Sequence, residues 1–152
     1  MEFGLDTDSR CNFCKMHADT AVHMFCHCPI LKPIWGFLDR VLQKMNFKFC
    51  FTENRKSSNF DLISSKIEKD EENLIIYMNS ITNYKIWKFS MKIQYEKEVF
   101  EEKEFVKSLM KTIGGRKNIE LSEHLKQCKK VAEISLLDMT IKQAFRNFYL
   151  PR

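Results

Sequence analysis

Four Cys and His side chains near the start of the chain constrain its fold more than any other feature. Cys11, Cys14, His23 and Cys28 follow the spacing C-x2-C-x8-H-x4-C. A two-residue gap lets one tight turn present two sulfur atoms to the same ion, and the later His and Cys return from a different element. Three thiolates and one neutral imidazole fill a tetrahedral coordination sphere around Zn²⁺. Because no position remains for an activated water, this spacing predicts a structural zinc site rather than a catalytic one.

The same cysteines have a second interpretation, a disulfide framework, since the chain contains six of them. The first eight residues lack the basic segment, the apolar segment and the small-residue cleavage site of a secretory signal. We therefore expect reduced thiols in an intracellular compartment, either cytoplasm or nucleus, where disulfides are rare. The lack of a secretory signal therefore favours a zinc site over a disulfide framework.

The identity of each ligand is less constrained than the presence of a metal. His17, Cys26 and His27 lie close enough in the sequence to replace one of the four ligands, and this alternative stays open. Cys50 and Cys128 have no partner at a matching spacing, so we expect them to be core or incidental thiols.

Apolar periodicity predicts a mainly α-helical chain after the zinc-binding module. Pro29 suits the first position of a helix, after which apolar residues recur every three or four positions. A second helix is predicted from Asn73 and is apolar on a broad surface, so most of it should be buried. We expect Trp87 and Ile81 of this helix to pack against Trp35 of the first.

Between these helices the pattern weakens, and this sets the domain boundaries. Residues 46–51 alternate polar and aromatic side chains, as a short strand does, whereas residues 54–59 are polar and unpatterned. We therefore predict a zinc-binding module with the first helix over residues 1–50, a loop over 51–72 and a helical region over 73–152.

The last third of the chain predicts a charged, amphipathic tail on a helical bundle. Residues 98–113 carry apolar side chains at helical spacing among lysines and glutamates, and Gly114 and Gly115 are suited to end that helix. A further helix is predicted over residues 119–132, and its apolar side continues toward Pro151.

Composition and motifs argue against several classes of function. With 44% hydrophobic and 30% charged residues and no long apolar run, the sequence is typical of a globular protein that does not enter a membrane. Only four glycines are present, and none forms a phosphate-cradling loop. Cys26 beside His27, and His124 near Cys128, are pairs whose closeness in sequence does not orient a nucleophile against a base. We expect no catalysis and no small-molecule substrate.

The residues around the predicted ligands resemble a known family. The similar features are a CxxC, an acidic-Thr pair ahead of the His, a Cys-Pro and a Trp on the next helix, here Cys11, Cys14, Asp19, Thr20, His23, Cys28, Pro29 and Trp35. They resemble the zinc-binding domain that follows the reverse transcriptase in non-LTR (LINE-type) retrotransposon polyproteins, where Glu is usual in place of Asp19. Residues 83–88 are similar to a "kyyIwk" stretch downstream in such polyproteins, so the resemblance covers about residues 5–93.

This resemblance implies a non-catalytic module that helps a neighbouring reverse transcriptase to hold RNA or single-stranded DNA. Two alternatives remain open. In the first, the chain is a zinc-stapled helical module that binds other proteins. In the second, it is a decayed retroelement fragment with no selected function.

The residues expected to bind nucleic acid are three lysines and two aromatic residues. Lys85, Lys88 and Lys92 share one stripe of the second predicted helix, so they can follow a phosphate backbone. Phe13 and Phe25 in the zinc module are candidates for stacking on bases, but packing around the metal is the favoured role of both, because a small zinc domain has little else to bury. The net charge is only +5, which predicts weak binding with little sequence preference.

Overall fold

The structure of the chain is a computed structural model that describes residues 9–55, 67–68, 71–113 and 134–149. In these residues the elements are the π-helix η1 (His23–His27) and the α-helices α1 (Lys32–Lys44), α2 (Phe51–Arg55), α3 (Glu72–Glu96), α4 (Glu102–Ile113) and α6 (Ile134–Tyr149). The described residues contain no β-strand, and one isolated antiparallel bridge joins Arg10 to Ala18. The prediction of a mainly α-helical fold with a Cys/His cluster near its N-terminus is confirmed.

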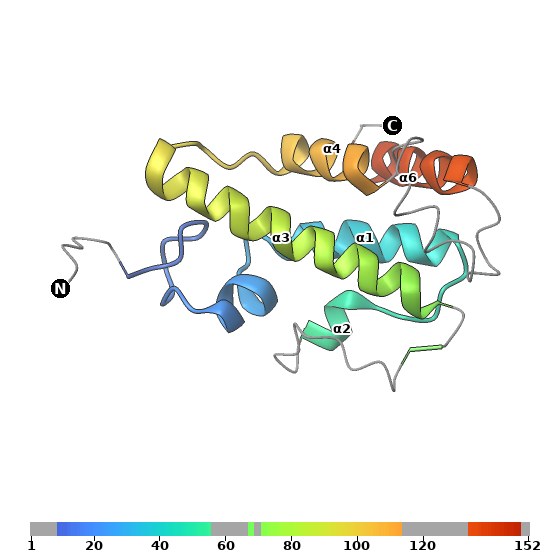
Figure 1. Cartoon of the computed structure of the whole chain (residues 1–152), viewed down its shortest axis with the longest axis horizontal. Helices are drawn as coiled ribbons and strands as arrows, with labels where there is room; N and C mark the ends of the chain where they lie inside the picture. The colour runs from blue at the N-terminus through green and yellow to red at the C-terminus, as the bar shows by residue number, and fades with distance from the viewer. Residues whose placement is uncertain (1–8, 56–66, 69–70, 114–133, 150–152) are drawn as a thin grey trace.

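Helix α1 lies at the centre of this arrangement and contacts α2, α4 and α6. The longer α3 crosses α1 obliquely and contacts α4, while α4 and α6 follow one edge of the molecule (Figure 1). The N-terminal segment with η1 lies at one end, and η1 contacts α2. The metal-ligand segment is therefore joined to the helices through η1.

Apolar side chains from all five described α-helices and from η1 form one continuous core. The amphipathic pattern of α1 explains its central place, since residues three and four positions apart lie on the same face of a helix. The most completely buried core side chains of the helices include Ile34, Phe37, Leu38, Val41, Leu42, Phe51, Leu74, Ile75, Met78, Ile86, Val106 and Leu109. Burial of such side chains contributes about 1.5–3 kcal/mol each.

Helix α1 begins later than the sequence predicts. The amide of Leu31 donates a hydrogen bond to the carbonyl of Cys28 (3.1 Å), so Pro29 lies in a turn rather than at the first helical position. Pro33 instead occupies the first turn of α1, where a missing N–H costs nothing.

The segment after α1 also differs from its prediction. No strand forms over residues 46–51, although the alternate side chains Phe47, Phe49 and Phe51 are all buried. Residues 51–55, expected to belong to a loop, form α2. Their helix is stabilised by Asp39, whose carboxylate accepts hydrogen bonds from the amides of Phe51 (2.6 Å) and Thr52 (3.2 Å). A carboxylate from a distant helix thus acts as the N-terminal cap, a signal absent from the local sequence.

The two tryptophans have different environments. Trp35 is 3% exposed, as predicted, and packs against Phe51 with 5.4 Å between ring centroids. Trp87 is 48% exposed, so the prediction that it packs against Trp35 is wrong. Ile81 is partly buried against the core.

Several predictions concern parts of the chain outside the described residues. These are the helix over residues 119–132, the helix end at Gly114 and Gly115, and the position of Cys128. Among the helices that are described, none combines the length and the apolar character needed to cross a bilayer.

Replacing Asp39 by Ala tests how far the fold depends on this buried cap. The substitution leaves the amides of Phe51 and Thr52 without their acceptor, so we expect the free energy of unfolding to fall by about 2–4 kcal/mol. Urea unfolding followed by circular dichroism measures the change. Arg40→Ala, at the exposed neighbouring position of α1, should alter stability by less than about 0.5 kcal/mol. Equal effects of the two substitutions would contradict this role of Asp39.

Candidate metal centre

The structure brings the four predicted ligands together. The ligand atoms of Cys11, Cys14, His23 and Cys28 all lie within 4.8 Å of one another. The Sγ atoms of Cys11 and Cys28 are 3.9 Å apart, and Sγ of Cys14 is 3.3 Å from Nε2 of His23. Cys11 and Cys28 are buried, while Cys14 and His23 are partly exposed. Four donor atoms at these separations form a group that can hold one metal ion.

A tight loop presents the first two ligands. The amide of Cys11 donates to the carbonyl of His17 (2.7 Å), and the amide of Lys15 donates to the carbonyl of Cys11 (2.9 Å). Lys15 adopts a left-handed backbone conformation, with φ of 60°, which reverses the chain directly after Cys14. The isolated bridge between Arg10 and Ala18 closes the base of this loop.

The last two ligands are held by η1. The amide of Cys28 donates to the carbonyl of His23 (2.7 Å), so a single hydrogen bond across five residues links the two ligand residues. At the other end of this turn, the hydroxyl of Thr20 accepts a hydrogen bond from the amide of His23 (3.0 Å). Thr20 therefore caps this turn and positions His23. This hydrogen bond explains the Thr of the acidic-Thr pair in physical terms.

The two buried thiols form a coupled pair. Hydrogen bonding from the Cys28 thiol lowers the pKa of Cys11 to about 4, and the amides of Cys14 and Phe13 add to this effect while burial opposes it. The contact with Cys11, together with burial, raises the pKa of Cys28. Metal ions bind thiolates, and amide hydrogen bonds to sulfur stabilise the thiolate form. Cys11 is therefore prepared to bind a cation.

The loop between Cys11 and Cys14 is fastened to α3. Nδ2 of Asn12 donates to the hydroxyl (2.8 Å) and to the carbonyl (3.1 Å) of Ser90. The ring of Phe13 lies 5.3 Å from that of Phe100 and 6.4 Å from that of Phe89, centroid to centroid. Phe13 is only 9% exposed, so it packs the loop onto α3 and offers no free face to a base, contrary to its predicted role.

The alternative ligands lie outside this group. Among the described residues, the cluster comprises the four predicted side chains and excludes His17, Cys26 and His27. His17 is exposed, although its ring centroid is 4.9 Å from that of His23. Cys50 serves a different role, since its thiol donates to the carboxylate of Asp39 (3.3 Å).

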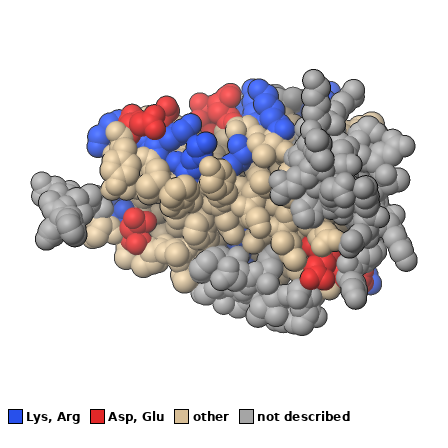
Figure 2. Space-filling model, in the orientation of Figure 1, with Lys and Arg blue, Asp and Glu red and all other residues tan. Residues whose placement is uncertain are grey.

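The three predicted lysines line a groove between α3 and α4, but they share it with acidic residues. This groove has a volume of about 490 Å³, and its other polar lining residues include Glu98, Glu101, Glu104 and Ser108. Nζ of Lys85 donates to the hydroxyl of Ser108 (3.0 Å), and burial, followed by the charges of Lys88 and Lys92, lowers the pKa of Lys85. Figure 2 shows basic and acidic side chains side by side along this edge of the molecule.

An exposed aromatic surface on α3 was not identified from the sequence. Tyr84, Trp87 and Tyr95 are 55%, 48% and 73% exposed. The rings of Tyr84 and Trp87 are 6.1 Å apart, and Nζ of Lys88 lies 5.8 Å from the ring centroid of Tyr84. The spacing of three and then eight residues places all three rings on one side of the helix, whereas the sequence pattern predicted that most of this helix is buried. We call Tyr84, Trp87, Lys88 and Tyr95 the α3 aromatic surface.

Comparison with known proteins adds no relative to this picture. No family model matches the chain, and no curated protein or solved structure matches it. The resemblance to retrotransposon zinc-binding domains remains an expectation from the sequence.

Two neighbouring cysteines provide a matched test of the metal centre. Cys28→Ser removes a ligand atom and should weaken metal binding at least about 100-fold, whereas Cys26→Ser should leave it within about twofold. Native mass spectrometry of the reduced proteins measures metal stoichiometry, with one ion per chain expected for the wild type. Loss of the ion from Cys26→Ser and its retention by Cys28→Ser would show that the fourth ligand is misassigned.

Proposed function

We propose that the metal is zinc and that it is structural. For Zn–S bonds of about 2.3 Å and a Zn–N bond of about 2.0–2.1 Å, a tetrahedron places two sulfurs about 3.8 Å apart and a sulfur and a nitrogen about 3.6 Å apart. The separations of 3.9 Å for Cys11 and Cys28 and 3.3 Å for Cys14 and His23 support this choice. Four protein ligands leave no open position for water, which supports a non-catalytic module.

We further propose that the chain is an intracellular module that binds single-stranded RNA or DNA through the α3 aromatic surface. The observation that carries this proposal is the exposure of Tyr84, Trp87 and Tyr95 beside the charge of Lys88. Exposed rings stack on bases without regard to sequence, and an adjacent ammonium group contacts the phosphate backbone. Tyr and Trp are also stiff side chains, so they lose little conformational entropy when a base stacks on them.

Charge limits the strength of this binding. The glutamates in the groove between α3 and α4 repel a phosphate group, and the ammonium group of Lys85 donates a hydrogen bond to the hydroxyl of Ser108. Of the three predicted lysines, Lys88 and Lys92 are therefore the better phosphate ligands. Few phosphate contacts give weak affinity that falls with salt.

The resemblance in the zinc module supports a retrotransposon reverse-transcriptase origin for the chain. Under this proposal the module holds template or target nucleic acid next to a reverse transcriptase. The genomic reading frame upstream provides a direct test, because a reverse transcriptase encoded in frame is expected there.

A fluorescence-anisotropy titration with a labelled, unstructured single-stranded RNA tests the binding surface. Trp87→Ala should weaken binding by about 5- to 150-fold, because stacking contributes about 1–3 kcal/mol per base, whereas Trp87→Phe keeps a ring and should retain most of the affinity. Lys88→Glu should reduce the salt dependence by about one unit of slope or more. Lys111→Glu, the same charge change at an exposed position of α4, is its control.

The same exposed rings also favour a second function, a protein-interaction surface. If the zinc-loaded protein does not bind RNA or DNA near physiological salt, or if Trp87→Ala and Lys88→Glu have no more effect than their controls, nucleic-acid binding is excluded for this surface. The protein-interaction module is then the better interpretation.

A further inference from the structure

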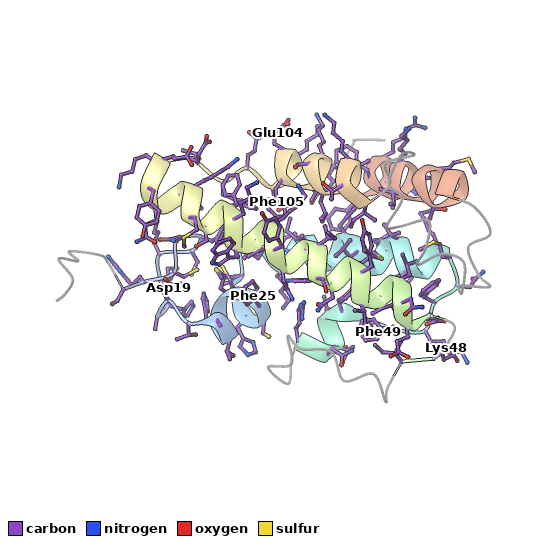
Figure 3. The ribbon with its side chains drawn as sticks, in the orientation of Figure 1. Asp19, Phe25, Lys48, Phe49, Glu104 and Phe105 are labelled. Atoms are coloured by element: carbon purple, nitrogen blue, oxygen red, sulfur yellow. The ribbon has the colours of Figure 1, made fainter. Side chains whose placement is uncertain are left out.

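A cavity of about 120 Å³ lies between η1, α1 and α2, beside the metal centre. Phe25, Cys26 and His27 contribute one wall from η1, and Phe25 is labelled next to this helix in Figure 3. Lys32 and Trp35 come from the start of α1, and Thr52 and Arg55 come from α2. The α3 aromatic surface contributes none of the described lining residues, so this cavity is separate from the proposed nucleic-acid surface.

The polar groups of this cavity are mostly hydrogen-bond donors. Arg55 is 2% exposed, and its guanidinium carbon lies 3.4 Å from the centroid of the Trp35 ring. Nη2 of Arg55 donates to Asn79 (2.6 Å), which fixes the plane of the guanidinium against the indole. Nε1 of Trp35 is buried and has no hydrogen-bond acceptor within the part of the chain that the structure describes. A buried indole N–H favours a site that brings an acceptor to it.

Charge in the cavity is positive. Burial lowers the pKa of Arg55 to about 10, so the guanidinium keeps its proton at neutral pH. Lys32 and His27 are exposed at the rim, and the described lining residues include no Asp or Glu. The groups that act electrostatically on Arg55 are the thiol of Cys26, which also lines the cavity, and the carboxylate of Asp39, whose oxygens accept hydrogen bonds from Phe51 and Thr52.

We propose that this cavity is a binding site for a phosphate group, held by Arg55 and the indole N–H of Trp35 with Lys32 at its rim. A phosphate group supplies several acceptor oxygens and the negative charge that a fixed guanidinium recognises. The group belongs either to free inorganic phosphate or to the end or backbone of a nucleic acid.

The indole N–H of Trp35 reports occupancy directly. In a Trp87→Phe background, Trp35 is the one remaining tryptophan, because the chain has two. Inorganic phosphate is added to the ¹⁵N-labelled, zinc-loaded full chain while sodium chloride keeps the ionic strength constant. A saturable downfield shift of the indole N–H resonance is expected. No shift, or an equal shift with chloride alone, would overturn the proposal.

Two substitutions separate binding from folding. Arg55→Lys keeps the charge but loses the planar donor pair, and phosphate should bind about tenfold more weakly. Because Arg55 is buried, its substitution can also change the fold, so a second variant, Lys32→Ala, is made at an exposed position. Lys32→Ala should weaken phosphate binding about two- to fivefold without affecting the fold. A shift that is undiminished in both variants would overturn the site as assigned.

Two oligonucleotides of the same sequence identify the source of the phosphate. A shift with the 5′-phosphorylated form alone assigns a terminal phosphate, and equal shifts with the 5′-phosphate and 5′-hydroxyl forms assign the backbone. A shift with inorganic phosphate but with neither oligonucleotide assigns the free ion. Since the readout is at Trp35, loss of RNA binding at the α3 aromatic surface leaves this result unaffected.

Discussion

The fold of the N-terminal part depends on the four-ligand centre, which joins two segments that have little other reason to meet. One segment is the loop carrying Cys11 and Cys14, and the other is the turn from His23 to Cys28 that leads into α1. If zinc occupies this centre as proposed, its apparent binding free energy, about 10–16 kcal/mol in small domains, exceeds what the few backbone hydrogen bonds of residues 9–28 supply. Because Asn12 holds the loop to Ser90, a metal bound by the four ligands would also connect α1 to α3.

Away from the metal, buried polar side chains take over the same joining role. Asp39 of α1 caps α2, and Arg55 of α2 reaches Asn79 of α3 while it stacks on Trp35 of α1. Each of these groups is buried and has its hydrogen bonds fixed by a different helix, so they determine which helices meet, whereas the apolar core supplies most of the stability. Within the described residues, the aromatic side of α3 has no buried polar partner of this kind, and Tyr84, Trp87 and Tyr95 stay exposed there.

The sequence predicted well which four Cys and His side chains come together, because their chemistry is local and their spacing is short. It also predicted the helical class and the burial of Trp35. It failed at Trp87, because a helix with apolar residues on a broad surface does not reveal which stripe faces solvent. It failed at α2 because the cap comes from Asp39, twelve residues before Phe51. The exposure of Trp87 and the formation of α2 both depend on how the helices pack together, and not on the helix propensity of the local sequence.

Hydrogen–deuterium exchange of the full chain, with and without its metal, tests the central claim most directly. Chelation should abolish protection of the amides in residues 11–28, and it should lower protection at the end of α3 around Ser90, where Asn12 binds. The amides of α1 from Phe37 to Leu42, in the apolar core, should stay protected. Unchanged protection of residues 11–28 after complete metal removal would contradict the account, because the loop and the turn would then be held together by something other than the metal.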